Sequence, residues 1–349
     1  MKILVITDLY PIQEKEKYTP KTIYSFVQSW KLLGHEVKII KPNFILNSFL
    51  RKKPFYKSGI YGDVENINYW LPFLGNIKNK IKTEFTPDIV IAHMPSGLIF
   101  ANRLRFDFCA GVHASDIEVL TNPIYKIYFK QELEKAYRNA NKIACRSFVL
   151  KEKFLKLYPE FTPKTFVAPS GVGAEVNIIK KELASKDKLK VLTCGQFIKR
   201  KNIDKVIIAC ESFNNIELTV IGSGPLENKL RKISHRCVFT GQLKHEEVLK
   251  KMRESDIFIL PSVNETFGMV YLEAMASGCI TVCTKGDGVD GIIRDGENGF
   301  TTETDKVKET LRKIIDYPDK AKIVENTYNT VLMYNDKRMA ENYLNSING

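Results

Sequence analysis

The sequence predicts a doubly wound α/β fold in two domains, and three observations support this. The chain has 349 residues, short β-branched apolar runs alternate with helical patterns, and the alternation pauses once near the middle. A chain of this length exceeds what one hydrophobic core usually holds, so two domains are expected. Strands that alternate with helices indicate a mainly parallel sheet with helices on both faces.

The first domain is predicted to cover residues 1–172. Residues 2–7 (KILVIT) indicate a buried parallel strand, and Thr19 and Pro20 are expected to be the N-cap and first residue of a helix that ends at Gly34. Further strands are expected at 37–40, 88–92, 108–112, 142–145 and 165–168. Residues 43–79 have no clear periodicity, so no element is predicted there.

The second domain is predicted to cover residues 173–329. A polar stretch ends near Lys188, and strands are then expected at 190–194, 217–221, 237–240, 257–260 and 280–283. Residues 321–348 are expected to form one or two helices. The side chains expected to be buried there are Tyr328, Leu332, Met333, Met339 and Tyr343.

Charge is unevenly distributed along the chain. Residues 1–170 contain 26 Lys and Arg against 15 Asp and Glu, a net charge of +11, whereas residues 171–349 contain 27 against 25, a net charge of +2. An anionic partner of the first half is one interpretation: a phospholipid surface, a phosphorylated acceptor or nucleic acid. The aromatic and basic residues 44–57 could lie at a membrane edge. The alternative is ordinary solvated lysines.

The cysteines and the N-terminus favour a cytoplasmic protein. Seven cysteines are scattered without a C-x-x-C pair, which argues against a disulfide framework or a zinc site. The apolar run after Lys2 is too short for a signal peptide or a membrane-spanning helix.

Residues 265–273 (ETFGMVYLE) are the most informative segment. They follow a predicted strand and lead into a helix expected to end at Gly278. A strand, a glycine-containing loop and a helix N-terminus present N–H groups and a positive dipole to a phosphate. Glu265 and Glu273 would then hold hydroxyl groups. The segment therefore predicts a nucleotide-sugar site, because ribose and hexose hydroxyls flank a pyrophosphate in such a ligand.

Residues 195–201 (GQFIKRK) place three consecutive cations after another predicted strand. These cations could neutralise charge that develops on a diphosphate leaving group. A solvated turn is the alternative. Gly222 and Leu243 also follow predicted strands, at the sheet edge where open α/β sheets bind ligands, and Leu243 could contact a nucleotide base.

In the first domain, residues 111–116 (GVHASD) follow a predicted strand. His113 and Asp116 are candidates for holding a sugar hydroxyl or an acceptor, although hydrogen-bonded loop residues are the alternative. For His93, which also follows a strand, the structural role is favoured.

These residues together resemble the retaining glycosyltransferases of family 4, whose GT-B fold has two Rossmann-like domains facing each other across a cleft. The likeness covers nearly the whole chain. Glu265 and Glu273 match the E-x7-E motif, and residues 195–201 match a Gly-Arg-x4-Lys segment. Residues 222–225, 169–172 and 113–116 match the Gly-x-Gly-Pro, Pro-Asn-Gly-Val and His-x-x-Asp segments.

The resemblance implies roles for the matched residues. Glu265 would contact sugar hydroxyls, Lys201 would bind phosphates and His113 would lie near the sugar at the cleft. Glu273 would hold the ribose, and the last helix, at about 330–349, would pack back on the first domain. The remaining candidates are Phe267, Gly268, Met269 and Val270 for the pyrophosphate, Gly195, Gln196, Arg200, Gly222 and Leu243 for the rest of the donor, and Asp116 for acceptor or sugar.

The chain departs from the family pattern at three places. Gln196 stands where the family usually has Arg, and Arg200 is a hypothetical substitute. The loop at 12–18 lacks the frequent Gly-Gly pair. Residues 286–291 (GDGVDG) replace the frequent Gly-Gly-x-Pro-Glu version of that segment.

The expected function is that of a retaining hexosyltransferase. It would move a hexose-type sugar from a nucleotide-diphosphate sugar to a hydroxyl of a glycan or lipid-linked acceptor, in cell-surface polysaccharide or lipopolysaccharide biosynthesis. No Asp-x-Asp pair is present, so no cofactor and no metal are expected. The expected location is the cytoplasm, including a peripheral position at the inner face of the plasma membrane.

Two other functions remain open from the residues. One is a GT-B nucleotide-sugar 2-epimerase or hydrolase. The other is a basic nucleic-acid-binding protein. The sequence has no recognisable base-reading motif and its acidic 265–273 segment would repel a phosphate backbone, so no nucleic-acid partner is expected.

Overall fold

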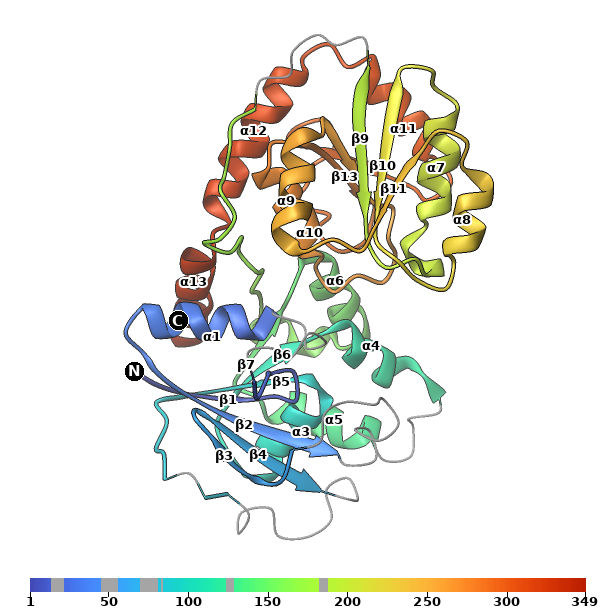
Figure 1. Cartoon of the computed structure of the whole chain (residues 1–349). Helices are drawn as coiled ribbons and strands as arrows, with labels where there is room; N and C mark the ends of the chain where they lie inside the picture. The colour runs from blue at the N-terminus through green and yellow to red at the C-terminus, as the bar shows by residue number, and fades with distance from the viewer. Residues whose placement is uncertain (14–21, 45–55, 70–80, 83, 124–128, 182–187) are drawn as a thin grey trace. The chain divides into compact units, whose positions relative to one another are not determined.

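The computed structural model of the chain describes residues 1–13, 22–44, 56–69, 81–82, 84–123, 129–181 and 188–349 (Figure 1). They divide into two compact units. The first comprises Met1–Arg146, Leu150–Ser170 and Asp336–Gly349, and the second comprises Ser147–Val149 and Gly171–Asn335. The predicted Thr19–Pro20 cap, and most of the stretch 44–57, lie outside the described residues.

The first unit contains an eight-stranded sheet in the order β3-β4-β2-β1-β5-β6-β7-β8. The order reverses between β1 and β5, which are neighbours and pair in parallel. All the neighbouring pairs of this sheet are parallel except β3 with β4, which is antiparallel. The strands are β1 (Lys2–Ile6), β2 (Glu36–Phe44), β3 (Gly59–Tyr61), β4 (Val64–Tyr69), β5 (Ile89–His93), β6 (Cys109–Val112), β7 (Lys142–Cys145) and β8 (Thr165–Val167).

Helices accompany these strands, and the last helix of the chain belongs to this unit. Trp30 Nε1 donates to the carbonyl of Ala340 at 3.0 Å, and the Tyr343 ring lies 5.3 Å from that of Phe26. The last helix is therefore fixed by buried aromatic packing and one buried hydrogen bond. The helices are α1 (Thr22–Leu32), α3 (Met94–Arg103), α4 (Ala114–Thr121), α5 (Phe129–Asn139), α6 (Phe148–Leu157), η3 (Pro159–Lys164) and α13 (Asp336–Asn348).

The second unit contains a six-stranded parallel sheet in the order β11-β10-β9-β12-β13-β14. Its strand order reverses between β9 and β12, and ligands of open α/β sheets bind at such a reversal, outside the carboxyl ends of the strands. The strands are β9 (Leu189–Cys194), β10 (Ile216–Ile221), β11 (Val238–Gly241), β12 (Ile257–Ile259), β13 (Ile280–Thr284) and β14 (Phe300–Thr302).

Helices cover both faces of the second sheet, as Figure 1 shows. They bury an apolar core that is continuous from Val191 on β9 to Phe300 on β14. The helices are η4 (Lys199–Lys201), α7 (Ile203–Glu211), α8 (Glu227–Ile233), α9 (His245–Glu254), α10 (Met269–Ala276), α11 (Val307–Ile315) and α12 (Lys320–Met333). The predicted α/β class with two Rossmann-like units is confirmed.

Two predictions about elements were wrong. Residues 59–69, where no element was predicted, form a hairpin that turns at Gly62, whose φ of +61° suits glycine. Leu332 and Met333 were expected to be buried but are 42% and 47% exposed. The buried face of α12 is formed instead by Ile323, Val324, Thr327 and Val331, the helical spacing that turns the two following side chains outward.

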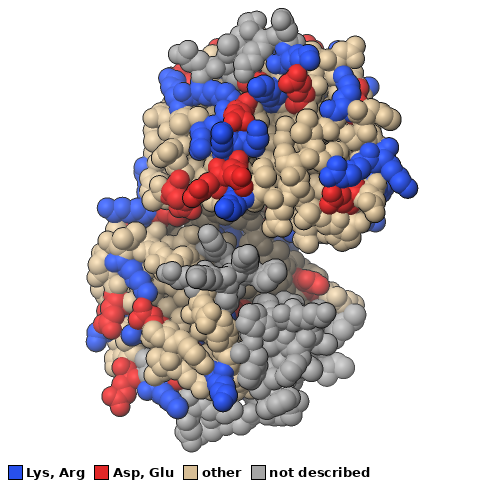
Figure 2. Space-filling view, in the orientation of Figure 1, with Lys and Arg blue, Asp and Glu red and all other residues tan. Residues whose placement is uncertain are grey.

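Basic and acidic side chains are mixed on the described surface in view (Figure 2). Figure 2 shows acidic side chains beside many of the basic ones on the face in view, so the described part of that face has no uniform basic patch. Within the described residues, no helix has both the length and the apolar composition needed to cross a bilayer.

Candidate functional site

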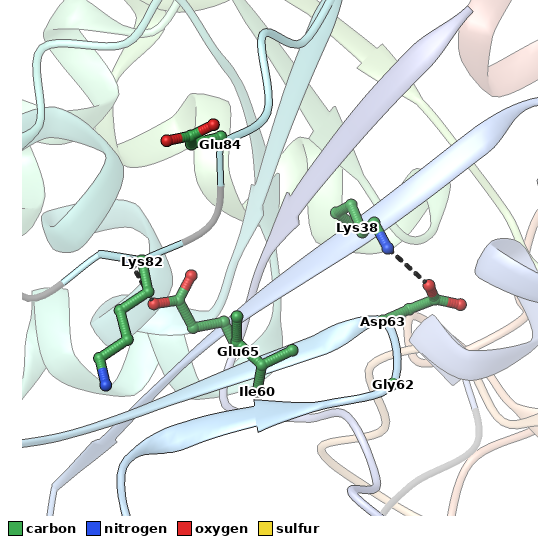
Figure 3. Close-up of a pocket in the computed structure, with 7 residues that line it drawn as sticks. All are labelled: Lys38, Ile60, Gly62, Asp63, Glu65, Lys82 and Glu84. Atoms are coloured by element: carbon green, nitrogen blue, oxygen red, sulfur yellow. Dashed lines mark hydrogen bonds and ion pairs between the residues drawn. The ribbon is translucent and has the colours of Figure 1, made fainter.

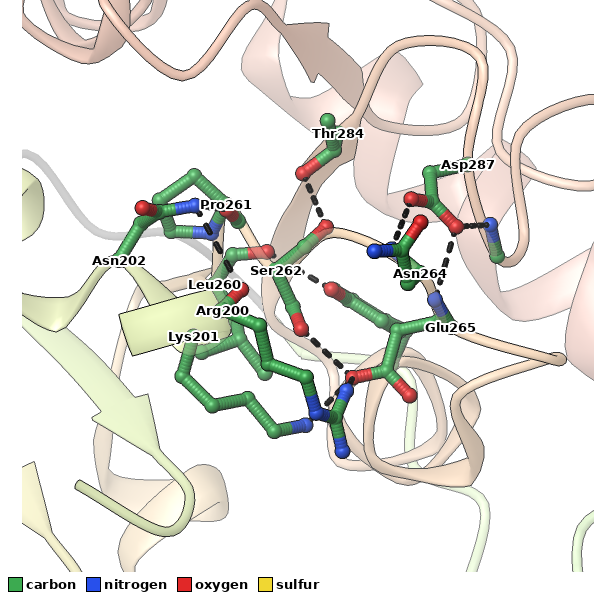
Figure 4. A network of polar contacts seen from close by, with 12 residues as sticks. Arg200, Lys201, Asn202, Leu260, Pro261, Ser262, Asn264, Glu265, Thr284 and Asp287 are labelled. Atoms are coloured by element: carbon green, nitrogen blue, oxygen red, sulfur yellow. Dashed lines mark hydrogen bonds and ion pairs between the residues drawn. The ribbon is translucent and has the colours of Figure 1, made fainter. Parts of the chain in front are cut away.

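The centre of the candidate site is the carboxylate of Glu265, in the loop between β12 and α10 (Figure 4). Its Oε1 accepts hydrogen bonds from Lys201 Nζ at 2.5 Å, Ser262 Oγ at 2.6 Å and Arg200 Nη1 at 2.8 Å. Lys201 and Arg200 lie in η4, after β9. The structure thus brings together, at the strand-order reversal, two segments that are 64 residues apart in the chain.

The two cations differ in their environment. The side chains of Lys201 and Glu265 are each 14% exposed, whereas that of Arg200 is 43% exposed. Burial raises the pKa of Glu265, but the charge of Lys201, hydrogen bonds from Lys201 and Ser262, and the charge of Arg200 outweigh it, so the pKa is held below its ordinary value. Glu265 is therefore an ionised acceptor, and Lys201 is its better shielded partner.

Backbone contacts join the two loops that meet here. Asn202 Nδ2 donates to the carbonyl of Pro261 at 2.8 Å, and the N–H of Val263 donates to the carbonyl of Arg200 at 2.9 Å. Asn202 and Asn264 both have positive φ, +49° and +59°, a conformation that asparagine tolerates better than most residues. The positions of Lys201 and Glu265 are thus set by two turns that are hydrogen-bonded to each other.

Helix α10 begins directly after this loop. Gly268 is its N-cap with φ of +97°, and a Cβ there would lie 2.6 Å from ring carbons of Tyr271, so glycine is required on both counts. Met269 and Val270 are the first two helical residues and are partly exposed, whereas Phe267 is buried. The first N–H groups of a helix lack acceptors within it and carry the positive end of its dipole. This end of α10 can therefore bind an anionic group.

The glycine turn after β10 supports the loop after β9. Gly222 has φ of +136°, and a Cβ there would lie 2.0 Å from the carbonyl oxygen of Gly195. The N–H of Phe197 donates to the carbonyl of Ser223 at 2.8 Å. At Gly195 the nearest atoms to a Cβ would be those of Lys201, at 3.6 Å. Gly222 thus allows close backbone packing against the segment that carries Lys201, while Gln196 is exposed.

Glu273, on α10, has a partner that sequence reasoning missed. His245 Nε2 lies 3.1 Å from Glu273 Oε1, and His245 is the first residue of α9. Leu243, two residues earlier, is partly buried against the core of this unit. Ser262 was also missed. His245 could have been found from the sequence, because it directly follows the loop that contains the candidate Leu243.

In the first unit, the candidate residues His113 and Asp116 lie in a buried cluster. His93 Nδ1 lies 3.0 Å from His113 Nε2, and the Tyr343 hydroxyl lies 3.4 Å from His93 Nε2. Asp116 accepts from the N–H of His113 at 2.9 Å and from the Tyr137 hydroxyl at 2.9 Å. His113 is 6% exposed, and His93 and Asp116 are fully buried.

Burial controls the charge of this cluster. It lowers the pKa of His113 to about 3, with the nearby charge of Arg146 adding to the effect. It also raises the pKa of Asp116 to about 7, although hydrogen bonds from His113 and Tyr137 oppose the change. His113 is therefore a neutral hydrogen-bonding group. That His113 and Glu265, which belong to different units, share one cleft stays a prediction.

A cavity of about 370 Å³ lies elsewhere in the first unit, near the amino ends of β2 and β4 (Figure 3). Asp63 at its edge pairs with Lys38 at 3.0 Å. Ligands of open parallel sheets bind at the carboxyl ends of strands, so this cavity is not the candidate site. It is lined by Lys38, Ile60, Gly62, Asp63, Glu65, Lys82 and Glu84.

The chain is similar to known glycosyltransferases. Residues 175–330, nearly all of the second unit, match the family described as glycosyl transferases group 1. The uncharacterized glycosyltransferase MJ1178 of Methanocaldococcus jannaschii is 29% identical over 250 residues, which are 68% of this chain and 67% of that protein. TuaC of Bacillus subtilis, a glycosyltransferase assigned to teichuronic acid biosynthesis, is 25% identical over 335 residues, 84% of this chain and 83% of that protein.

Solved structures agree on the fold. The crystal structure of Anabaena HepE in complex with UDP has a TM-score of 0.74 at 16% identity and covers 100% of both chains. At that identity the likeness shows the fold, which is the GT-B fold of two Rossmann-like units. The matched segment and the relatives identify this chain as an enzyme of the glycosyltransferase class.

Proposed function

We propose that the protein is a retaining glycosyltransferase that moves a hexose-type sugar from a nucleotide-diphosphate sugar to a hydroxyl group. One observation carries this proposal: Glu265 is bound to Lys201 and Arg200 beside the N-terminus of α10, where the strand order of the second unit reverses. Two cations and a helix N-terminus suit a diphosphate, and a carboxylate suits sugar hydroxyls.

In the proposed reaction, the bond between the anomeric carbon and the diphosphate breaks and the pair of electrons leaves with the phosphate oxygen. Lys201 and the first amides of α10 stabilise that charge more strongly in the transition state than in the bound donor. The acceptor hydroxyl attacks the oxocarbenium-like sugar from the same face and gives its proton to the departing phosphate. Glu265 orients the sugar and is not the nucleophile.

The donor exchanges partners with the protein when it binds. In the structure, Lys201 and Arg200 both donate to Glu265. A diphosphate offers these cations stronger acceptors, and the released Glu265 Oε1 can then accept from sugar hydroxyls. Glu273 holds the ribose in this proposal, and Leu243 contacts the base. No metal takes part, because the cations and the helix N-terminus meet the charge of the leaving group.

The acceptor is proposed to be a glycan or lipid-linked hydroxyl of cell-surface polysaccharide or lipopolysaccharide biosynthesis. The name of TuaC, a relative over most of the chain, supports this proposal. The net charge of +11 on residues 1–170 supports an anionic acceptor or a peripheral position at the membrane.

A thermal-shift panel tests the donor site. UDP is compared with UDP-glucose, GDP with GDP-mannose and ADP with ADP-glucose, each with and without EDTA. A ligand that binds the folded state raises the unfolding temperature by mass action, so one base should stand out. EDTA should not change the result. If no nucleotide stabilises the protein, the proposed function is wrong.

An epimerase or hydrolase is distinguished by incubation without an acceptor. The selected nucleotide sugar and the wild-type protein are mixed alone. A transferase should release nucleoside diphosphate slowly, because water replaces the acceptor poorly. Rapid release, or conversion of the sugar to another isomer, would support the alternative.

A further inference from the structure

The backbone of Glu265 is held by a second carboxylate, that of Asp287 in the loop after β13 (Figure 4). Asp287 Oδ1 accepts from the N–H of Glu265 at 2.9 Å and from that of Gly288 at 2.7 Å. Its Oδ2 accepts from the N–H of Asn264. Asp287 is 7% exposed, so water competes little for these bonds.

These bonds fall where the backbone needs support. Asn264 has φ of +59°, a conformation that costs energy for a residue other than glycine. The N–H groups of Asn264 and Glu265 both donate to the one carboxylate of Asp287, and hydrogen bonds to a carboxylate are stronger than those between neutral groups. Asp287 therefore stabilises the turn that aims Glu265 toward Lys201 and Ser262.

Packing brings the same loop directly against Glu265. Gly288 has φ of +52°, and a Cβ there would lie 3.2 Å from the Cβ of Glu265 and 2.8 Å from the carbonyl oxygen of Phe267. The loop is itself closed by Asp290, whose Oδ2 accepts from the N–H of Gly286 at 2.5 Å. Asp290 is thus a second carboxylate in this loop, and its side chain accepts a hydrogen bond from the loop and not from the backbone of Glu265.

We propose that Asp287 is a positioning residue for sugar recognition: it sets the backbone of Glu265 and thereby the direction in which the Glu265 carboxylate meets the donor sugar. The inference rests on the proposed function of Glu265. It gives a role to Asp287 within residues 286–291 (GDGVDG), where this chain differs from the Gly-Gly-x-Pro-Glu segment frequent in the family it resembles.

The test is a double-mutant cycle in nucleotide binding. Calorimetry measures the affinity of the diphosphate and of the nucleotide sugar selected by the thermal-shift panel for wild type, Asp287→Ala, Glu265→Ala and the double variant. We expect Asp287→Ala to weaken nucleotide-sugar binding about 10-fold, as loss of hydrogen bonds to a charged group does. Diphosphate binding should change by less than about 2-fold, the tolerance of independent sites.

The interaction energy between the two substitutions distinguishes a positioning role of Asp287 from a general effect on stability. If Asp287 acts through Glu265, Asp287→Ala should add no further loss of nucleotide-sugar affinity in the Glu265→Ala background. Asp290→Ala is the matched control and should keep wild-type selectivity for the nucleotide sugar. Asp287→Asn, which retains one acceptor oxygen, should show the same pattern with a smaller loss, and it carries the test if Asp287→Ala does not fold.

Two outcomes would overturn the inference. One is additive losses in the double variant, and the other is equal losses of diphosphate and nucleotide-sugar affinity in Asp287→Ala or Asp287→Asn. Failure of the proposed function is a different result, because the wild-type protein would then bind none of the nucleotides tested.

Discussion

The two sheets each have a strand-order reversal, at β1 and β5 in the first unit and at β9 and β12 in the second, yet their chemistry differs. The second unit presents charges that keep some contact with water, namely Lys201, Arg200 and Glu265. The first presents His93 and His113, buried and with lowered pKa values. Contact with water allows the second unit to carry these charges, whereas burial keeps the two histidines of the first unit neutral.

Under the proposed function, this difference suits the two units to different ligands. An anionic diphosphate needs cations and a helix N-terminus, which the second unit provides. An uncharged hydroxyl needs fixed donors and acceptors, and His113 is the candidate of the two, because His93 is fully buried and both of its ring nitrogens have partners within the cluster.

Removing the shielded cation should have the largest consequence. Lys201→Ala is expected to lower turnover by roughly 10²-fold or more, the usual scale for a positioned electrostatic group. Arg200→Ala should cost less, because its more exposed charge is better screened by solvent and salt. Release of nucleoside diphosphate from the donor gives the rates, with Lys199→Ala as the control in the same turn. Near wild-type turnover in Lys201→Ala would contradict the electrostatic role of this unit.

An added methyl group should be tolerated less well at the end of β6 than after β9, because the first position is more tightly packed. A Cβ at Gly111, on β6, would lie 1.9 Å from Nδ1 of the buried His93, so Gly111→Ala should destabilise the protein by about 1–3 kcal/mol. Gly195→Ala is the matched control after β9, because its Cβ would meet Lys201 at an ordinary 3.6 Å. Urea denaturation measures both. Equal destabilisation by the two substitutions would show that the histidine cluster is not tightly packed.

The pH dependence of stability should reveal the opposed titrations of His113 and Asp116. The lowered pKa of His113, about 3, makes stability rise with pH from about 3 to 6.5, because the unfolded chain binds the proton more readily. The raised pKa of Asp116, about 7, makes stability fall as pH rises from about 4 to 7, because the folded state keeps that proton longer.

Asp116→Asn removes the second contribution and leaves the first. The variant should therefore gain stability more steeply than wild type between about pH 4.5 and 6.5. Urea midpoints at several pH values provide the measurement, and Asp107→Asn, an exposed position of the same unit, is the control. Parallel curves for Asp116→Asn and wild type would count against a raised pKa of Asp116.

The smallest expected effect is at the ribose end of the site. The His245 side chain is 41% exposed, and an exposed pair of side chains contributes about 1 kcal/mol or less, so His245→Ala should weaken nucleotide binding by less than about 5-fold. If His245 orients Glu273 toward ribose hydroxyls, the loss should shrink for the 2′-deoxy diphosphate. An equal loss for both sugars would place His245 outside ribose recognition.

Local patterns were sufficient for much of the fold and for part of the site. Apolar runs that alternate with helical patterns predict parallel α/β units without knowledge of long-range contacts. The order of the motifs predicts that Lys201 and Glu265 each follow a strand. Those two residues do meet, at 2.5 Å. The hairpin at 59–69 was missed because it contains a buried Glu65 and a buried Asn66, which hide its apolar alternation.

Contacts between distant segments could not be predicted from the sequence, because they form when the chain folds. Nothing near Asp287 in the sequence shows that its carboxylate accepts the N–H of Glu265, 22 residues earlier. The pairing of His93 with His113 and Tyr343 likewise depends on how β5, β6 and α13 pack. The residue types that stand at strand ends could be predicted from the sequence. Only folding decided which of them touch, because hydrogen bonds and burial depend on distance in space, and periodicity measures distance along the chain.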